Sequence, residues 1–270
     1  MNTAVFDGRG FAKGKENKLK SEVKKLRSKG IKPKLVSILV GEDPASALYV
    51  NLKRSAAERV GAEVEIVKLQ KGEKTEKLKD IIKKYNKNKA VHGIMVQLPL
   101  PDSLKLEAKS IINAISPEKD VDGLREDSPY ITPVVKAVLA ALEVGTKYIT
   151  PSVLRTVVAG AGGFEGKKII KALSDMGYDV FGLGRETKDL ATYTKQADIL
   201  ISVTGQEGLI RKDMVKKGAL IIDVGSPKGD VDKNAYGKAS FVSPVPGGIG
   251  PVTISCLLEN LVETASRKKI

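Results

Sequence analysis

The sequence is poor in the residues that build disulfides, metal sites and stacking surfaces. Its 270 residues include one cysteine, one histidine and no tryptophan, and aromatic residues make up only 4%. A single cysteine excludes an intrachain disulfide, which is typical of a reducing compartment, so we expect a cytoplasmic protein. No group of residues has the spacing of metal ligands, and we therefore predict no metal site.

Long apolar runs are also missing. No stretch approaches the roughly 20 apolar residues needed to cross a bilayer, and the first segment, MNTAVFDGRGFAKGK, lacks the apolar core of a secretory signal. Hydrophobic residues still form 41% of the chain, enough for a substantial core. We therefore expect one large or two ordinary globular domains and no membrane partner.

Acidic residues are fewer than basic residues. The chain has 46 Lys and Arg against 32 Asp and Glu, a net charge of +14, which raises the question of a nucleic-acid partner. The lysine-rich segments, such as KGKENKLKSEVKKLRSKGIKPK, interleave acidic residues at helical spacing, as solvated helix faces do. Few aromatic side chains are available to stack on bases. We expect no nucleic-acid partner, and the basic surface suits a small polyanionic ligand equally well.

Strand and helix patterns alternate along the whole chain. Apolar runs bounded by glycine or proline predict strands at 34–40, 62–69, 92–101, 154–160, 178–184, 197–203 and 219–225. Helices are expected at 44–60, 73–86, 103–115, 131–145, from the glycine-rich turn to about 176, and 250–267. This alternation is typical of βαβ units around parallel sheets and predicts an α/β fold.

A glycine-rich turn marks the second half as a dinucleotide-binding domain. In VVAGAGGFEGKKII, Gly160, Gly162, Gly163 and Gly166 follow a predicted strand and precede a predicted helix. Glycine permits a tight turn and close approach of the backbone to a pyrophosphate at the helix N-terminus. The required order of strand, turn, helix and second strand is present, so we predict a Rossmann-type domain.

The end of the next strand, GLGRET, bears on the choice of cofactor. Arg185 favours NADP, because a guanidinium grips a ribose 2′-phosphate with two hydrogen bonds. The adjacent Glu186 leaves NAD open, because an acidic residue at this place usually binds the 2′-hydroxyl. An arginine exposed in a loop is the alternative interpretation of Arg185.

Four polar residues of the first half are expected to converge. The helix at 44–60 has Asp43 as its N-cap, and it places Tyr49 and Lys53 one turn apart on the same face. Gln97 ends a predicted strand and Asp122 lies in the loop PEKDVDG. Ligands of open α/β sheets bind outside the carboxyl ends of strands, where these residues gather. A lysine held neutral by its surroundings can act there on a proton or a water.

These segments resemble the methylenetetrahydrofolate dehydrogenase/methenyltetrahydrofolate cyclohydrolase family. The matching strings are VGEDPASALYVNLK, VHGIMVQLPLP, INAISPEKDVDGL and SPVPGGIGPVTISCLLENLV, with FDGRGFA near the start and GALIIDVG further on. The resemblance covers essentially the whole chain. It implies two domains around a cleft: a folate-binding catalytic domain at 1–130, completed by a helix at 251–270, and a Rossmann-like domain at 131–250.

The resemblance implies a two-step reaction on a folate substrate. Methylenetetrahydrofolate is oxidised with NADP to the methenyl form, which is hydrolysed to 10-formyltetrahydrofolate. Lys53 matches the catalytic lysine, Tyr49 its partner, Gln97 the glutamine that positions it and Asp122 a folate-contacting aspartate, although Asp120 shares the segment. The remaining substrate contacts match Leu98, Pro99, Pro246, Gly247 and Gly248. The cofactor contacts match Gly160, Ala161, Gly162, Gly163, Gly166, Arg185, Thr204 and Gly205. A homodimer formed through the cofactor domain is also implied.

Departures from the family pattern concentrate in the cofactor domain. Ala161 and Gly162 stand where the family has arginine and serine, and Lys167 replaces a proline. Arg185 is our hypothesis for the replacement phosphate contact. The segment after DVDGL is also shorter than usual before Thr132 and Pro133. Two alternatives therefore stay open: a cyclohydrolase whose dehydrogenase step is lost or uses NAD and, more distantly, a basic nucleic-acid-binding protein with a decayed active site.

Overall fold

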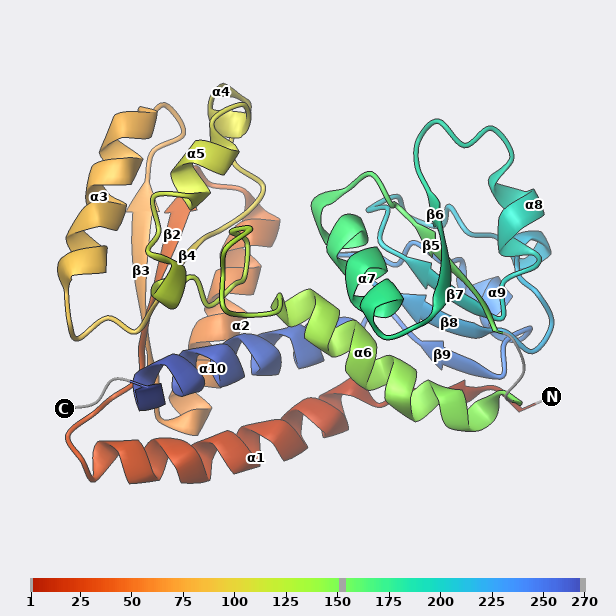
Figure 1. Ribbon diagram of the computed structural model, residues 1–270, viewed down its shortest axis with the longest axis horizontal. Helices are drawn as coiled ribbons and strands as arrows, with labels where there is room; N and C mark the ends of the chain where they lie inside the picture. Colours follow the sequence, from red (N-terminus) through yellow and green to blue (C-terminus); the bar gives the residue numbers. More distant parts are fainter. Residues whose placement is uncertain (1, 151–153, 268–270) are drawn as a thin grey trace. The chain divides into compact units, whose positions relative to one another are not determined.

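The computed structural model describes residues 2–150 and 154–267, which divide into two compact units (Figure 1). One unit contains residues 13–133 and 254–270, and we call it the three-stranded unit after its sheet. The other contains residues 1–12 and 134–253, and we call it the six-stranded unit. Residues 1–12, which the sequence analysis places in the folate domain, thus belong to the six-stranded unit, and residues 268–270 of the expected final helix lie outside the described residues.

The sheet of the three-stranded unit has the order β3-β2-β4 with all strands parallel. The strands are β3 (Glu63–Leu69), β2 (Lys34–Val40) and β4 (Gly93–Val96). Side chains alternate between its faces, so that Leu35 and Met95 join one apolar core while Val36 and Ile94 join another. Helices α2 (Pro44–Val60) and α10 (Ile249–Arg267) supply the first core, and α3 (Thr75–Lys87) supplies the second.

Helix α2 begins and ends where its sequence predicts. The Asp43 carboxylate accepts a hydrogen bond from the Ser46 N–H at 2.7 Å, and Pro44 occupies the first turn. Gly61 ends the helix with φ of 85°, a left-handed conformation that glycine adopts without a Cβ penalty. The orientation of the residues on this helix is therefore fixed by its own caps.

The helix expected at 103–115 is wrong as a single element. The chain instead forms α4 (Asp102–Lys105) and α5 (Ala108–Ile112), with a break at which Leu106 is 98% exposed. The break lets Leu104 and Ile111 both reach the core beneath α3. Tertiary packing has overridden local helix propensity.

The six-stranded sheet is fully parallel, in the order β1-β9-β8-β7-β5-β6. Its strands are β1 (Ala4–Val5), β9 (Phe241–Ser243), β8 (Leu220–Asp223), β7 (Ile199–Ser202), β5 (Arg155–Ala159) and β6 (Asp179–Leu183). The chain passes from β5 to β6 on one side and then returns to β7 on the other, so the strand order reverses between β5 and β7. Such a reversal is where α/β sheets bind dinucleotides, and the expected Rossmann-type architecture is confirmed.

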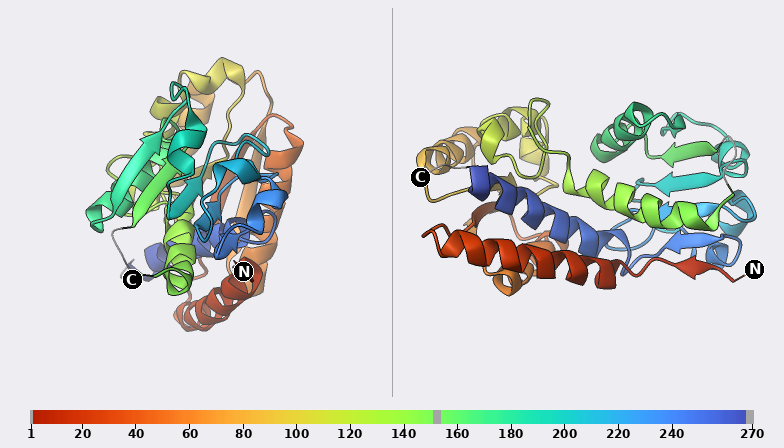
Figure 2. Two further views of the ribbon diagram at one scale, coloured as in Figure 1. Left: turned by 90° about the vertical axis from the view of Figure 1, so that its right-hand side faces the viewer. Right: turned by 60° about the horizontal axis from the view of Figure 1, so that its bottom comes forward.

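The sequence analysis missed the two short strands β1 and β9, which pair through Ala4 and Phe241. The remaining helices are α1 (Gly8–Arg27), α6 (Pro133–Gly145), α7 (Phe164–Asp175), α8 (Leu190–Thr194) and α9 (Lys233–Tyr236), with 3-10 turns at Pro117–Lys119, Thr146–Tyr148 and Lys212–Met214. In the three-stranded unit α1 runs beside α10 (Figure 2), and Lys15 pairs with Glu259 at 2.6 Å. Within residues 2–150 and 154–267, no helix combines the length and apolarity of a membrane span.

Candidate active site

Lys53 lies with its ammonium group inside the three-stranded unit. The residue is only 9% exposed, and its Nζ lies 2.9 Å from Gln97 Oε1 and 3.6 Å from Met95 Sδ. Met95 and Gln97 project from the same face of the chain at the carboxyl end of β4, which α2 covers. Helix and strand thus deliver the lysine and the glutamine to one point.

Gln97 is itself oriented by the chain that follows it. Its Nε2 donates to the Leu98 carbonyl oxygen at 2.9 Å, which leaves Oε1 directed at Lys53. Because the amide carries no charge, it can hold the lysine in either protonation state. The positioning role of Gln97 stays a prediction, and this hydrogen bond is the contact on which it depends.

Burial lowers the pKa of Lys53 from its ordinary value of 10.5. The low-polarity surroundings disfavour the ammonium form, whereas the negative charge of Asp122 acts in the opposite direction. Desolvation is the larger effect. Burial therefore shifts Lys53 toward the neutral amine, the form that has a lone pair and can accept a proton.

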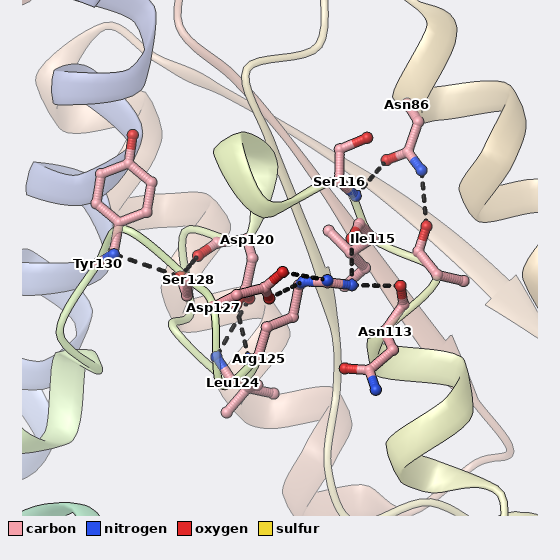
Figure 3. A network of polar contacts seen from close by, with 11 residues as sticks. Asn86, Asn113, Ile115, Ser116, Asp120, Leu124, Arg125, Asp127, Ser128 and Tyr130 are labelled. Atoms are coloured by element: carbon pink, nitrogen blue, oxygen red, sulfur yellow. Dashed lines mark hydrogen bonds and ion pairs between the residues drawn. The ribbon is translucent and has the colours of Figure 1, made fainter.

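The structure distinguishes the two aspartates of the PEKDVDG segment. Asp120 is fully buried, and its carboxylate accepts hydrogen bonds from the backbone N–H groups of Leu124 at 3.2 Å and Arg125 at 2.8 Å (Figure 3). Asp120 therefore holds the loop together. Asp122 is partly exposed and is the aspartate whose charge acts on Lys53. The geometry favours Asp122 over Asp120 as the substrate-facing residue.

Arg125 organises the short segment that follows. Its guanidinium makes a two-pronged ion pair with Asp127, at 2.7 and 2.8 Å, and also donates to the carbonyl oxygens of Asn113 and Ile115 (Figure 3). The Ser128 hydroxyl donates to the Asp120 carbonyl oxygen at 3.1 Å. These contacts tie the loop beyond Asp122 into a compact turn.

The other expected contacts of this unit lie on the same elements. Tyr49 is half-buried on α2, one turn before Lys53, while Leu98 and Pro99 follow Gln97 with intermediate and high exposure. Pro246, Gly247 and Gly248 belong to the six-stranded unit, directly after β9. The structure thus groups Lys53 with Gln97 and Asp122 in one unit, and the PVPGG segment belongs to the other.

Within the six-stranded unit, all predicted cofactor residues lie at the carboxyl edge of the sheet. The glycine turn follows β5, Arg185 follows β6, and Thr204 and Gly205 follow β7. The PVPGG segment follows β9 at the same edge, and Gly247 adopts φ of 107°. Parallel strands bring these loops together because all of them end on one side.

Two glycines of the turn are required by close contacts. Gly160 has φ of 94°, and a Cβ there would collide with the Val203 carbonyl oxygen; a Cβ on the buried Gly166 would collide with the Gly160 carbonyl oxygen. At Gly162 no atom lies within 4 Å of the Cβ position, so the turn is open on that side. Gly163 is the N-cap of α7, and Ala161 donates its N–H to the Leu183 carbonyl oxygen at 3.0 Å. An open turn ahead of a twelve-residue helix fits a pyrophosphate.

At the end of β6, Arg185 and Glu186 are both exposed. The Glu186 carboxylate packs on Gly184, where any added Cβ would collide with it. The Gly184 N–H donates to the Thr187 hydroxyl at 3.2 Å. The strand end therefore offers both a guanidinium and a carboxylate to a ribose, as the sequence analysis expects.

Sequence reasoning gave no role to two buried acids of the six-stranded unit, Asp223 and Asp230. Asp230 binds the Thr204 N–H, so it contacts a predicted cofactor residue from behind. The only sequence signal is an aspartate at the end of the apolar run ALIIDVG, followed by a second in GDVD. Their mutual arrangement depends on tertiary contacts.

Comparison with known proteins identifies the family. The sequence profile of the tetrahydrofolate dehydrogenase/cyclohydrolase catalytic domain matches residues 6–122, and that of the corresponding NAD(P)-binding domain matches residues 137–269. The chain belongs to the tetrahydrofolate dehydrogenase/cyclohydrolase family. The bifunctional protein FolD of Bacillus licheniformis is 39% identical over 99% of both chains, which agrees with the resemblance seen in the sequence.

Solved structures of this family share the fold of the chain. The FolD methylenetetrahydrofolate dehydrogenase/cyclohydrolase of Campylobacter jejuni is 35% identical with a TM-score of 0.90, covering 98% of this chain and 99% of its own. The enzyme of Trypanosoma brucei, solved with NADP cofactor and an inhibitor, is 33% identical with a TM-score of 0.91 and covers 99% of each chain. The α/β fold with a catalytic and an NAD(P)-binding domain is therefore established for this chain.

The contacts at Gly166 predict a sharp difference between two glycines of the turn. Gly166→Ala should lower the free energy of unfolding by about 1–3 kcal/mol, because the methyl group would collide with the Gly160 carbonyl oxygen. Gly162→Ala should change it by less than about 0.5 kcal/mol, because its Cβ position is open. Denaturant unfolding followed by circular dichroism measures both, and equal losses would contradict the assigned contacts.

The lowered pKa of Lys53 predicts a gain in stability when the amine is removed. Below pH 10.5 the unfolded chain keeps a proton that the buried amine tends to lose, so this residue makes stability rise with pH between the lowered pKa and 10.5. Lys53→Met should remove that slope and raise the unfolding free energy at pH 7 by about 1 kcal/mol or more. Thermal unfolding of both proteins across pH 6–10 measures the difference, and a less stable variant at pH 7 would oppose it.

Proposed function

We propose that this chain oxidises 5,10-methylenetetrahydrofolate with NADP and hydrolyses the resulting 5,10-methenyl form to 10-formyltetrahydrofolate. The observation that carries the proposal is the buried Lys53 amine, held 2.9 Å from Gln97 Oε1 and acted on by the charge of Asp122. A buried amine with a neutral hydrogen-bond partner suits chemistry on a cationic carbon. Membership of the family and the match to the bifunctional FolD proteins support the same substrate.

The residues of the six-stranded unit fit a dinucleotide. The open turn at Gly162 and the start of α7 offer room and backbone N–H groups to the pyrophosphate, and Arg185 offers a guanidinium to a 2′-phosphate. Thr204 and Gly205 lie beside the turn, since the Gly160 Cβ position is 3.1 Å from the Thr204 nitrogen. When bound there, NADP supplies the acceptor for the hydride that leaves the one-carbon bridge.

Lys53 serves the oxidation by staying uncharged. Loss of hydride leaves a positive charge on the methenyl group, and an ammonium nearby would oppose its formation by like-charge repulsion. Burial shifts Lys53 toward the neutral amine, and Gln97 orients it without adding charge. Asp122, with its negative charge, favours the developing cation.

Hydrolysis uses the same amine as a base. A water molecule forms a bond to the methenyl carbon and gives one proton to the neutral Nζ of Lys53. The bond from that carbon to N5 then breaks as the remaining hydroxyl proton of the adduct passes to N5, so that the formyl group stays on N10, and the proton held by Lys53 is released to solvent. Tyr49, one helical turn from Lys53, is proposed to align the substrate, with Leu98 and Pro99 beside it.

We also propose an oligomeric state and a compartment. The family resemblance supports a homodimer formed through the six-stranded unit. The single cysteine, which is buried on α10, supports a cytoplasmic location. Light scattering of the purified protein measures the mass of the particle. A monomer at micromolar concentration would remove the dimer from the proposal and leave the chemistry intact.

Removing the amine tests the catalytic assignment. Lys53→Ala should lower the rate of methenyltetrahydrofolate hydrolysis by about 100-fold or more, because it removes the proton acceptor. The matched control is Arg54→Ala, which removes an exposed cation from the same helix and should keep the wild-type rate. The loss of methenyl absorbance follows hydrolysis directly. A variant that hydrolyses at the rate of the wild type would overturn the role of Lys53.

Arg185 determines the predicted preference for NADP. Arg185→Ala should raise the KM for NADP by about tenfold and leave the KM for NAD within about twofold, because only NADP carries the phosphate that the guanidinium grips. Arg211→Ala, an exposed arginine paired with Asp213 in the same unit, is the control. Equal changes for the two cofactors would show that Arg185 does not read the phosphate.

A further inference from the structure

Two acidic side chains are buried at the carboxyl edge of the six-stranded sheet without an assigned role. Asp223 ends β8 and Asp230 lies in the loop that follows, and both are fully buried. The chain between them turns back so closely that the Asp230 N–H donates to Asp223 Oδ1 at 3.0 Å. Burying two carboxylates together is costly, so their geometry calls for a physical explanation.

Asp230 holds the end of the neighbouring strand. Its Oδ2 accepts hydrogen bonds from the Ser202 hydroxyl at 2.9 Å and from the Thr204 N–H at 2.5 Å. Ser202 is the last residue of β7, and Thr204 with Gly205 forms the loop predicted to contact the cofactor. A charged acceptor on a backbone N–H is among the stronger hydrogen bonds in proteins. Asp230 therefore fixes this loop from the protein side.

Asp223 fixes the loop that contains Asp230. Its two oxygens accept from the N–H groups of Gly225 at 2.9 Å, Asp230 at 3.0 Å and Val231 at 3.0 Å. Gly229 fits beside it only because it lacks a side chain: a Cβ there would lie 2.5 Å from Asp223 Oδ2 and 3.3 Å from Val245 Cβ. Val245 belongs to the PVPGG segment, so the same loop packs against the predicted folate-contacting chain of this unit.

The Asp223 carboxylate lies in surroundings that disfavour its charged form. Burial raises the pKa of Asp223 to about 6, the charge of Asp230 adds to this effect, and the three backbone N–H groups oppose it. Burial raises the pKa of Tyr236 at the end of α9, the hydrogen bond from the Val245 N–H lowers it, and the charges of Asp223 and Asp232 raise it further. Within the described residues, Oδ1 of Asp230 has no hydrogen-bond partner. One oxygen of the pair is therefore not used in holding the fold.

We propose that Asp230 and Asp223 are positioning residues for the dinucleotide, with Asp230 holding the Thr204–Gly205 loop and Asp223 holding Asp230 in place. Neither residue touches the cofactor, because both are buried beneath the loops that do. The inference rests on the proposed dinucleotide site at this edge. It assigns a function to an acidic pair that a purely structural core would replace with apolar residues at lower cost.

Two substitutions at one position separate the hydrogen bond from the charge. Asp230→Ala removes the acceptor of Thr204 and should raise the Kd for NADPH by about tenfold. Asp230→Asn keeps an oxygen for Thr204 and Ser202, places its NH2 group at the unpartnered Oδ1, and should raise the Kd by less than about threefold. Asp198→Asn is the matched control, since Asp198 precedes β7 at the opposite edge and accepts from Arg155 N–H and Lys216. It should bind as the wild type does.

The pH profile distinguishes positioning from simple folding. NADPH fluorescence titrations between pH 5 and 8 give the Kd of the wild type and of Asp230→Asn at each pH. The cofactor phosphate titrates with a pKa near 6 in both experiments, so the ratio of the two Kd values at each pH cancels its effect. The wild type should show the additional inflection near the Asp223 pKa of about 6, and Asp230→Asn should move it to lower pH by removing a neighbouring charge. Superimposable profiles, or Asp230→Ala binding as tightly as the wild type, would overturn the proposal.

Amide hydrogen exchange tests the same inference without any cofactor. In the unliganded protein, the Thr204 and Gly205 amides should exchange at least tenfold faster in Asp230→Ala than in the wild type, and at near wild-type rates in Asp230→Asn. Unchanged exchange in Asp230→Ala overturns the positioning role. If the exchange changes as expected while the wild type binds neither NADPH nor NADH, the proposed dinucleotide site fails and the Asp230 contact with this loop stands.

Discussion

The chemistry proposed here depends on one buried amine and the uncharged group that holds it. Lys53 could satisfy its hydrogen bonds more easily in water, and burial alone would leave its position undefined. The Gln97 amide, itself fixed by the Leu98 carbonyl oxygen, supplies a direction without supplying a charge. A carboxylate in that place would bind the lysine more strongly and would also keep it protonated. Burial lowers the pKa of Lys53, and the neutral partner orients the amine without raising that pKa.

Aspartates have different roles in the two units. In the PEKDVDG segment, Asp120 accepts hydrogen bonds from backbone N–H groups of its own loop, whereas the charge of Asp122 acts on Lys53. At the carboxyl edge of the six-stranded sheet, Asp223 and Asp230 are both directed inward, at the backbone of loops that line the predicted cofactor site. In each case a buried aspartate accepts hydrogen bonds from the backbone of a loop.

Much of this arrangement could be predicted from sequence, for identifiable physical reasons. The bounds of α2 follow from local groups, namely the Asp43 cap, Pro44 and Gly61, and were predicted to the residue. The central strands were found because they are apolar runs buried on both faces. The grouping of Lys53 with Gln97 and Asp122 was expected from motifs, and the structure shows the hydrogen bond between Lys53 and Gln97 and an effect of the Asp122 charge on Lys53. The break at Leu106 could not be predicted, because it depends on packing beneath α3.

The aspartates show the same difference between features that follow from local sequence and features that depend on tertiary contacts. The family register alone selected Asp122 over Asp120, because only the fold shows which carboxylate turns toward the backbone of its loop. Asp230 was missed, because its partners Ser202 and Thr204 lie at the end of a different strand, β7. Contacts between loops of neighbouring parallel strands leave no periodic signal in the sequence.

The short strand β1 joins two segments that lie far apart in the chain. Ala4 and Val5 pair with Phe241 and Val242, so one outer edge of the six-stranded sheet combines the first and the last of its strands along the chain. During synthesis on the ribosome, β1 must wait until β9 has been made, after all the other strands of the sheet. This edge is therefore the last part of the sheet that can close.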